Sequence, residues 1–362
     1  MERKENLQYE SRMRTLYRQD GFPVLQNRTY SDRDDAVSCI KGDIHLVEDL
    51  LTGLVYNAAF DPGLLSYDRH YNNEQGFSSE FKSHLHQVAR IVENYLGRKS
   101  LVEIGCGKGT FLEMLLGNGI DVKGFDPAYE GDSLHVAKEL FSEKTPVKGK
   151  GLILRHVLEH IEDPFSFLQK ISIANGGDAR VYIEVPCFDW ICQHKTWFDV
   201  FYEHVNYFRL QDLQNLFGDV LKCGRIFGGQ YLYVVANLST LRQPKYSATT
   251  AIEFPADFNS PLEMSVDDSC EQKIIWGASS KGVIYSLLIE RFGRPVDFAI
   301  DINPAKQGRY LPGTGVRVHS PEDAISFIRP GQIIYVMNSN YIPEISAATS
   351  GNYILKGIDS VA

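Results

Sequence analysis

The sequence has few cysteines, no long apolar run and no excess of basic residues. Its 362 residues include six cysteines, without the paired short spacings of a zinc module or the density of a disulfide scaffold. No stretch approaches the roughly 18 apolar residues of a membrane-spanning helix, and the charged N-terminus leads into no apolar signal segment. Lys plus Arg total 37 against 46 Asp plus Glu, which argues against a broad phosphate-binding surface. These absences predict a cytoplasmic chain with reduced thiols that binds neither nucleic acid nor membrane.

The composition is that of a folded chain with more than one domain. Hydrophobic residues make up 43% and charged residues 23%, close to the averages for folded domains. The length suggests two or three domains. A Pro-, Ser- and Thr-containing stretch over residues 238–270 interrupts the α/β pattern. We therefore expect an N-terminal region over 1–78 with no clear strand or helix, a central α/β domain over 79–240 and a C-terminal α/β domain over 241–362.

The central region predicts a Rossmann-like α/β domain. Apolar residues recur every three or four positions over 79–96, which indicates an amphipathic helix. A short apolar strand over 100–104, a glycine turn, a helix over 110–116 and a strand over 122–125 follow. This order is that of a right-handed crossover between parallel strands. Later apolar runs predict further strands over 151–154, 181–185 and 230–236.

The glycine turn at the end of the first strand predicts a nucleotide-type ligand. Gly105, Gly107 and Gly109 allow close backbone approach, because glycine has no Cβ and adopts unusual dihedral angles. Asp126 follows the next strand, where a carboxylate accepts hydrogen bonds from ribose hydroxyls. A dinucleotide fingerprint would need glycine at position 110, which is Thr110.

The pattern Glu103-x-Gly105-x-Gly107-x-Gly109 instead resembles motif I of class I S-adenosylmethionine (SAM)-dependent methyltransferases. The resemblance continues in the segments 124–127 and 154–164. It implies SAM as the cofactor. No third strand and no adenine-contacting acid are evident between the two segments. The residues expected at the cofactor are Glu103, Gly105, Cys106, Gly107, Gly109, Asp126, Pro127 and His156.

A second segment, 199–208, brings a histidine next to a carboxylate and tyrosines. A histidine held by a carboxylate can act as a general base near neutral pH. The alternative for His204 is a structural histidine whose hydrogen bonds are satisfied by its neighbours. The run Glu203-His-Val-Asn-Tyr-Phe208 resembles the Glu-His-x-x-Tyr-Phe signature of C-methyltransferases that act on keto-deoxysugar nucleotides. This resemblance implies that His204 removes the proton next to a sugar ketone.

The same resemblance extends to other candidate residues. A tyrosine that precedes the base by three residues in typical family members is replaced by Phe201, with Tyr202 beside it. The residues implied for catalysis are thus His204, Glu203, His160 and Tyr202, and Tyr71 and Tyr207 are expected to contact substrate. For His156 and Glu159, the alternative to a functional role is that both side chains lie in solvent at the start of a helix.

The N-terminal region resembles the tail of that family's zinc-binding domain. Four thiolate or imidazole ligands are needed for such a site, but the first 100 residues contain Cys39 as their only cysteine. Histidines in this part of the chain lack a convincing zinc spacing. We therefore expect a degenerate lid region without metal.

The C-terminal region restarts the α/β pattern. Gly277-Ala-Ser-Ser-Lys-Gly282 lies between a strand and a helix, and Asp301 ends the next strand. By itself this pattern is close to the dinucleotide fingerprint Gly-x-Gly-x-x-Gly, with Ser279 at the second glycine position. The alternative is a nucleotide-type fold that serves only as a scaffold. The turn and the segment 301–312 also resemble the C-terminal domain of the sugar C-methyltransferases. That resemblance implies phosphate binding near Ser279, Ser280 and Lys281, with Asn340 at the border of the same cleft.

Together these features predict a SAM-dependent methyltransferase that methylates a carbon next to a ketone of a sugar nucleotide or related natural-product intermediate. Three alternatives stay open: an O-methyltransferase, a nicotinamide-dependent oxidoreductase that uses the C-terminal unit, and a non-catalytic SAM-binding or assembly protein. The expected partner is a small-molecule substrate, and the chain is expected to be a monomer or homodimer.

Overall fold

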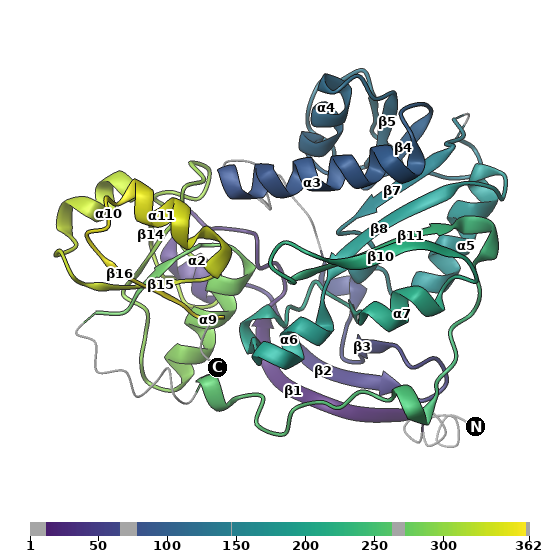
Figure 1. Ribbon diagram of the computed structural model, residues 1–362. Coiled ribbons are helices and arrows are strands. Elements are labelled where there is room, and N and C mark those ends of the chain that lie inside the picture. Colours follow the sequence, from purple (N-terminus) through teal and green to yellow (C-terminus); the bar gives the residue numbers. More distant parts are fainter. Residues whose placement is uncertain (1–11, 66–77, 146, 263–271, 360–362) are drawn as a thin grey trace.

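The computed structural model describes residues 12–65, 78–145, 147–262 and 272–359, which together form three β-sheets (Figure 1). The largest has seven strands in the order β10-β11-β8-β7-β4-β5-β6. The strands from β8 to β6 run parallel, whereas β11 runs antiparallel to β8 and β10. This sheet confirms the Rossmann-like α/β class. Its strands are β4 (Leu101–Ile104), β5 (Val122–Phe125), β6 (Val136–Ala137), β7 (Gly151–Arg155), β8 (Arg180–Pro186), β10 (Val220–Ile226) and β11 (Tyr231–Asn237).

The helix predicted over 79–96 is present as α3 (Ser79–Leu96). Its apolar stripe is buried, because residues three and four apart share one helix face. Ser78 caps the first turn by accepting a hydrogen bond from the Phe81 amide, and Gly97 ends the helix with a φ of 88°. Other helices along this part of the chain are α4 (Thr110–Gly117), η2 (Leu158–His160), α5 (Pro164–Asn175), α6 (Phe188–His194), η3 (Trp197–Asp199), α7 (Leu210–Asn215), η4 (Leu238–Thr240) and η5 (Ala248–Thr250).

The third strand of the parallel set, which the sequence did not reveal, is β6. It has only two residues and pairs parallel with β5. A two-residue strand carries no periodic pattern of its own, so its pairing with β5 is visible only in three dimensions. It lies in the stretch between Pro127 and Gly151, where no strand was evident in the sequence.

The C-terminal sheet has five parallel strands in the order β14-β13-β12-β15-β16. All three residues of its central strand β12 are buried, as expected for a strand covered on both faces. Its elements are β12 (Ile274–Trp276), α9 (Ser280–Arg291), β13 (Phe298–Ile300), β14 (Val318–His319), α10 (Pro321–Phe327), β15 (Ile333–Val336), η6 (Ser339–Tyr341), α11 (Ile342–Ala348) and β16 (Ile354–Gly357).

The N-terminal region, for which no clear strand was expected, forms an antiparallel sheet in the order β1-β2-β3-β9. Register shifts interrupt the pairing of β1 with β2, so the alternation of buried and exposed side chains is broken along β1. Because of that irregularity, the hydrophobic pattern of the sequence does not indicate the strand. The elements are β1 (Met13–Pro23), α2 (Arg33–Val37), β2 (Lys41–Asp49), β3 (Val55–Asn57), η1 (Pro62–Leu64) and β9 (Asn206–Tyr207). Tyr71 lies outside the described residues.

Side-chain contacts join the three sheets. Trp197 of η3 stacks on Tyr285 of α9, with ring centroids 5.6 Å apart, and both rings are buried. Arg309 donates hydrogen bonds to the Oγ1 and the carbonyl oxygen of Thr29, in the N-terminal region. Figure 1 shows the C-terminal sheet beside the seven-stranded sheet, with β1 and β2 below the latter. No helix in the described ranges is both long enough and apolar enough to cross a bilayer.

Gly282 is required by packing, and its replacement tests the fold of the C-terminal unit. A Cβ at Gly282 would clash with the backbone carbonyl oxygen of Gly277. We expect Gly282→Ala to lower the free energy of unfolding by about 1–3 kcal/mol, as an overpacked site does. Gly117→Ala is the matched control, because nothing lies within 4 Å of an added Cβ there; it is expected to be neutral or to stabilise by up to about 1 kcal/mol. Thermal unfolding measures both, and equal melting temperatures for the two variants would contradict the packing argument.

Candidate functional site

The glycine turn after β4 presents open backbone to a cavity. Gly105, Gly107 and Gly109 have φ angles of 72°, 56° and 80°. A Cβ added at Gly107 would meet no atom within 4 Å, so the space above this residue is open. Gly105, Cys106 and Gly107 line a cavity of about 440 Å³. Gly109 begins α4 instead, and an added Cβ there would lie 3.4 Å from the Tyr129 ring.

Asp126 holds the glycine turn in place. One of its carboxylate oxygens accepts a hydrogen bond from the Gly107 amide and the other from the Ala128 amide, each at 2.8 Å. Asp126 is half-buried and Pro127 is exposed, and neither is part of the cavity lining. The carboxylate therefore binds the backbone of the turn and does not itself line the cavity.

Glu103 is a buried acid that lines the cavity beneath the turn. Its side chain is 2% exposed, and its Oε2 atom has no hydrogen-bond partner among the described residues. Burial raises the pKa of Glu103 to about 8, with Arg155 acting in the opposite direction. A cavity-lining acid with an unpartnered oxygen, together with the open space over Gly107, fits a bound ligand with polar groups. The residues present thus fit a SAM molecule seated on this turn.

A network of buried charges lies beside the turn. Glu184 is fully buried and accepts hydrogen bonds from His84 at 3.2 Å, Arg155 at 3.0 Å and Tyr182 at 2.5 Å. His156 lies 3.2 Å from the same carboxylate. Glu184 was not among the predicted site residues, although a charged residue within an apolar strand was the available signal.

His156 adopts a φ of 52°, which is uncommon for a residue other than glycine. Burial disfavours its charged form, but hydrogen bonds to Glu159 and Glu184 outweigh that effect and raise the pKa of His156 to about 9. The imidazolium therefore sits between two carboxylates and lines the cavity. Glu159 is buried by these contacts and is not part of a solvated helix start.

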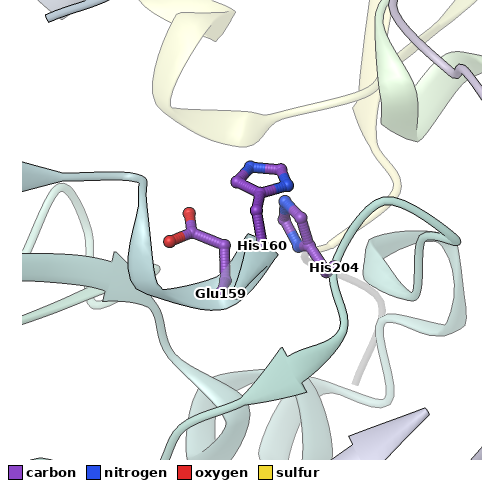
Figure 2. Close-up of side chains that lie close together, drawn as sticks. All are labelled: Glu159, His160 and His204. Carbon is purple, nitrogen blue, oxygen red and sulfur yellow. The ribbon is translucent and has the colours of Figure 1, made fainter. Parts of the chain in front are cut away.

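Two histidines from separate segments lie close together (Figure 2), and both line the cavity. His160 ends η2, and His204 lies just before β9. Their ring centroids are 5.0 Å apart in an edge-to-face arrangement, and Phe201 packs edge-on against His204 at 4.8 Å. Burial and the neighbouring His160 lower the pKa of His204 to about 3. His204 is therefore neutral, with a lone pair available on its ring.

The carboxylate grouped with these rings is that of Glu159, and Glu203 is not part of the group. Glu203 lines the cavity, but its Oε2 accepts a hydrogen bond at 2.9 Å from the Gln26 amide of the N-terminal region. Adjacency in the chain favoured Glu203 as the partner of His204. Glu203 instead lies in a turn and is held by Gln26, and the acid grouped with His204 in the fold is Glu159.

The two tyrosines of this segment hold the backbone in place. The Tyr202 hydroxyl accepts a hydrogen bond at 2.8 Å from the Asp61 amide. The Tyr207 hydroxyl donates to the Phe201 carbonyl oxygen and accepts from the Phe201 amide, both at 2.9 Å. Neither tyrosine is part of the cavity lining. Their hydroxyls are thus occupied by the loop that carries His204.

The C-terminal glycine turn forms the opposite wall of the cavity through Ser279, Ser280 and Lys281. Lys281 lies 3.0 Å from both the Asp199 carboxylate and the Gln230 side-chain oxygen. Ser280 accepts a hydrogen bond from Asn27 at 3.0 Å.

Behind this wall, Lys306 is fully buried and donates to the Ser279 hydroxyl, and burial lowers the pKa of its ammonium. Asp301 repeats the arrangement of Asp126, since its carboxylate accepts from the Ala278 and Asn303 amides at 2.8 Å. Asn340 is not in the lining; its side chain donates to the Phe227 carbonyl oxygen at 3.1 Å.

Comparison with protein families gives two matches. Residues 78–220 match the model described as a methyltransferase domain, and residues 262–357 match the model described as a C-methyltransferase C-terminal domain. Among curated proteins, the C-methyltransferase NovU of Streptomyces niveus is 22% identical over 325 residues, which is 76% of this chain and 76% of NovU.

Two methyltransferase structures are among the solved structures that match part of this chain. One is the 1,6-didemethyltoxoflavin-N1-methyltransferase of Burkholderia thailandensis with bound 1,6-didemethyltoxoflavin and S-adenosylhomocysteine. It has 15% identity and a TM-score of 0.36, and the match covers 51% of this chain and 95% of that one. The other is a SAM-dependent methyltransferase from Archaeoglobus fulgidus, with 17% identity and a TM-score of 0.32, covering 46% of this chain and all of that one.

The buried acid Glu103 predicts a pH-dependent stability. Because its pKa is raised from 4.5 to about 8, the folded chain keeps a proton that the unfolded chain loses between these values. Its stabilising contribution is complete below the unfolded pKa and is lost as the pH rises through about 8. Each pH unit in this window costs up to about 1.4 kcal/mol.

We expect Glu103→Gln to reduce the fall in melting temperature between about pH 5 and about pH 8. Glu143→Gln changes an exposed acid and is the matched control. Thermal unfolding across this pH range measures the effect. An equal fall in wild type and Glu103→Gln would show that this carboxyl does not hold a proton in the fold.

Proposed function

We propose that the chain, which belongs to the class I SAM-dependent methyltransferases and carries a C-methyltransferase C-terminal domain, methylates the carbon next to a ketone of a sugar nucleotide or a related natural-product intermediate. One observation carries the proposal: a single cavity is lined by the motif I glycine turn, the two histidines and the C-terminal glycine turn. An acceptor with a reactive ring at one end and an anionic group at the other suits these two walls.

The motif I wall is proposed to bind SAM. Bound SAM supplies an electrophilic methyl group on a sulfonium ion. The open backbone at Gly107 would lie against the cofactor, since an added Cβ there would meet no atom within 4 Å, whereas the Val157 side chain fills the space over Gly105. Asp126 would orient the turn and take the ribose hydroxyls at its rim, and Glu103 would receive a donor group of the cofactor.

His204 is proposed as the general base. It takes the proton from the carbon next to the ketone, which leaves the electron pair on that carbon for bond formation with the methyl group. Its ring lies at the cavity beside His160, and Phe201 supports its edge. His160 would bind an oxygen of the acceptor. Such positioning accelerates methyl transfer strongly, because reacting atoms that are already held in line avoid the entropy loss of an encounter.

The C-terminal wall is proposed to bind the anionic end of the acceptor. The first turn of α9 begins at Ser280, and the unpaired amide groups of a helix start attract phosphate oxygens. Lys306 supplies a buried ammonium through Ser279, and Lys281 supplies a second one at the cavity. The proposed C-terminal domain, 241–362, would therefore select the carrier part of the substrate, and the proposed central domain, 79–240, would carry the chemistry.

The cofactor assignment predicts tight binding of S-adenosylhomocysteine that depends on Asp126. We expect Asp126→Ala to weaken binding at least tenfold in calorimetric titration, because the Gly107 amide and the ribose lose their acceptor. Asp121→Ala is the matched control. Asp121 also accepts a hydrogen bond from a backbone amide, that of Ser100 at 2.9 Å, but this contact lies at the start of β4 and β5 and not at the glycine turn. An equal loss of affinity in both variants would mean that the carboxylate acts only on the fold.

The base assignment predicts loss of turnover with retained cofactor binding. His204→Gln should lower methyl transfer to keto-sugar nucleotides by about 10²- to 10⁴-fold, the usual range for a general base, and should leave S-adenosylhomocysteine binding unchanged. His86→Gln, on the exposed side of α3, is the control.

A second readout separates carbon from oxygen methylation. In D₂O with S-adenosylhomocysteine, wild type should exchange the acceptor proton next to the ketone, and His204→Gln should not. Methyl transfer to a hydroxyl without any such exchange would replace the proposal with O-methylation.

A further inference from the structure

We propose that Glu159, His160 and His204 form a binding site for one divalent transition-metal ion such as Zn²⁺ or Co²⁺. Each of the three residues offers one ligand atom, and these atoms all lie within 4.8 Å of one another. Figure 2 shows the carboxylate and the two imidazoles grouped together, from η2 and from the loop that precedes β9. Two imidazole nitrogens and one carboxylate oxygen are a common ligand set for these ions.

The carboxylate is the strongest indication of a missing partner. Glu159 is 1% exposed, and its Oε2 atom has no hydrogen-bond partner among the described residues. Its other oxygen lies 3.2 Å from His156 Nδ1, which fixes the orientation of the group. A buried acceptor without a donor costs free energy, so native structures rarely leave one unsatisfied. A cation at the centre of the cluster would give this carboxylate a second positive partner beside His156.

The ring of His160 is oriented as in metal sites. Its Nδ1 lies 2.8 Å from the backbone carbonyl oxygen of Glu203, and a carbonyl only accepts hydrogen bonds. Nδ1 therefore carries a proton, and Nε2 is the nitrogen through which this ring can bind a metal ion. Histidines that bind metals usually donate their second ring nitrogen to a carbonyl or carboxylate in this way. The Val205 amide bonds to the Glu159 carbonyl oxygen at 2.7 Å, which ties the two segments together.

The site also has an open side. All three residues line the cavity, so water or an acceptor oxygen can complete the coordination, as in sites with three protein ligands. The expectation of no metal came from the cysteines and histidine spacings of the N-terminal region. This cluster uses residues from two distant segments that only the fold brings together.

The metal site does not depend on which acceptor the protein methylates. It shares His204, however, with the proposed function, in which His204 is the general base. One lone pair of His204 cannot hold a metal ion and take a proton at the same time. A bound ion is therefore expected to block proton exchange at the acceptor, while S-adenosylhomocysteine binding continues.

The test is titration of the full chain with CoCl₂ and ZnCl₂ in a buffer without chelator. We expect one ion per chain, with the affinity lowered at least tenfold in Glu159→Gln and in His160→Gln and unchanged in His86→Gln. Bound cobalt should show ligand-field absorption without the charge-transfer band of a cobalt–thiolate bond, which separates this site from the free cysteines. Retained S-adenosylhomocysteine binding by each variant shows that it folds.

Equal affinity in wild type and both ligand variants, or a thiolate band, would overturn the site. Undiminished proton exchange at saturating zinc would overturn the exclusion between the ion and the base. Failure of the proposed function is distinguishable, because a chain that methylates no keto-sugar nucleotide would still bind, or fail to bind, cobalt at these residues.

Discussion

The carboxylate of Glu184 is the constraint on which the inner wall of the cavity depends. It is fully buried in β8 and is bonded to His84 of α3, Arg155 at the end of β7 and Tyr182 of its own strand, with His156 at 3.2 Å. Desolvating a carboxylate is costly, and several charged or polar donors are needed to offset that cost. The donors cannot move without exposing an uncompensated charge. The ends of β7 and β8, and the start of the segment that carries Glu159 and His160, are thereby fixed in relation to α3.

The segment that carries His204 is held from a different direction. Glu203 accepts from the Gln26 amide, and the Val205 carbonyl oxygen accepts from the Asn57 amide at 2.8 Å. Two residues of the same segment form β9 at the edge of the N-terminal sheet. Antiparallel pairing thus anchors the histidine loop to residues more than a hundred positions earlier in the chain. The two sheets together therefore fix the position of His204 against His160. Among residues 12–65, the described part of the N-terminal region before α3, Asn27 alone lines the cavity.

The two glycine turns share one physical device. In each, an aspartate at the end of the following strand accepts a backbone amide of the turn, Gly107 for Asp126 and Ala278 for Asp301. The turns differ in what surrounds their glycines. The space over Gly107 is open, whereas Gly282 is needed because Gly277 packs against it. The sequence pattern was similar in both, but only the first turn leaves room at its second glycine for a ligand to reach the backbone directly.

Local sequence was sufficient to predict α3, the parallel strands β4, β5, β7 and β8, and the glycine turns, because hydrophobic periodicity and glycine positions are properties of consecutive residues. It was also sufficient to indicate a SAM-dependent methyltransferase from three ordered motifs. It did not predict β1, whose alternation is broken by register shifts, or β6, which exists only through its pairing with β5. Nor did it identify Glu159 as the acid beside His204, since chain adjacency favoured Glu203. The partners of a buried charge come from whichever segments the fold packs together, so the chemistry of single motifs was set by the sequence, whereas their meeting in one cavity was decided by tertiary structure alone.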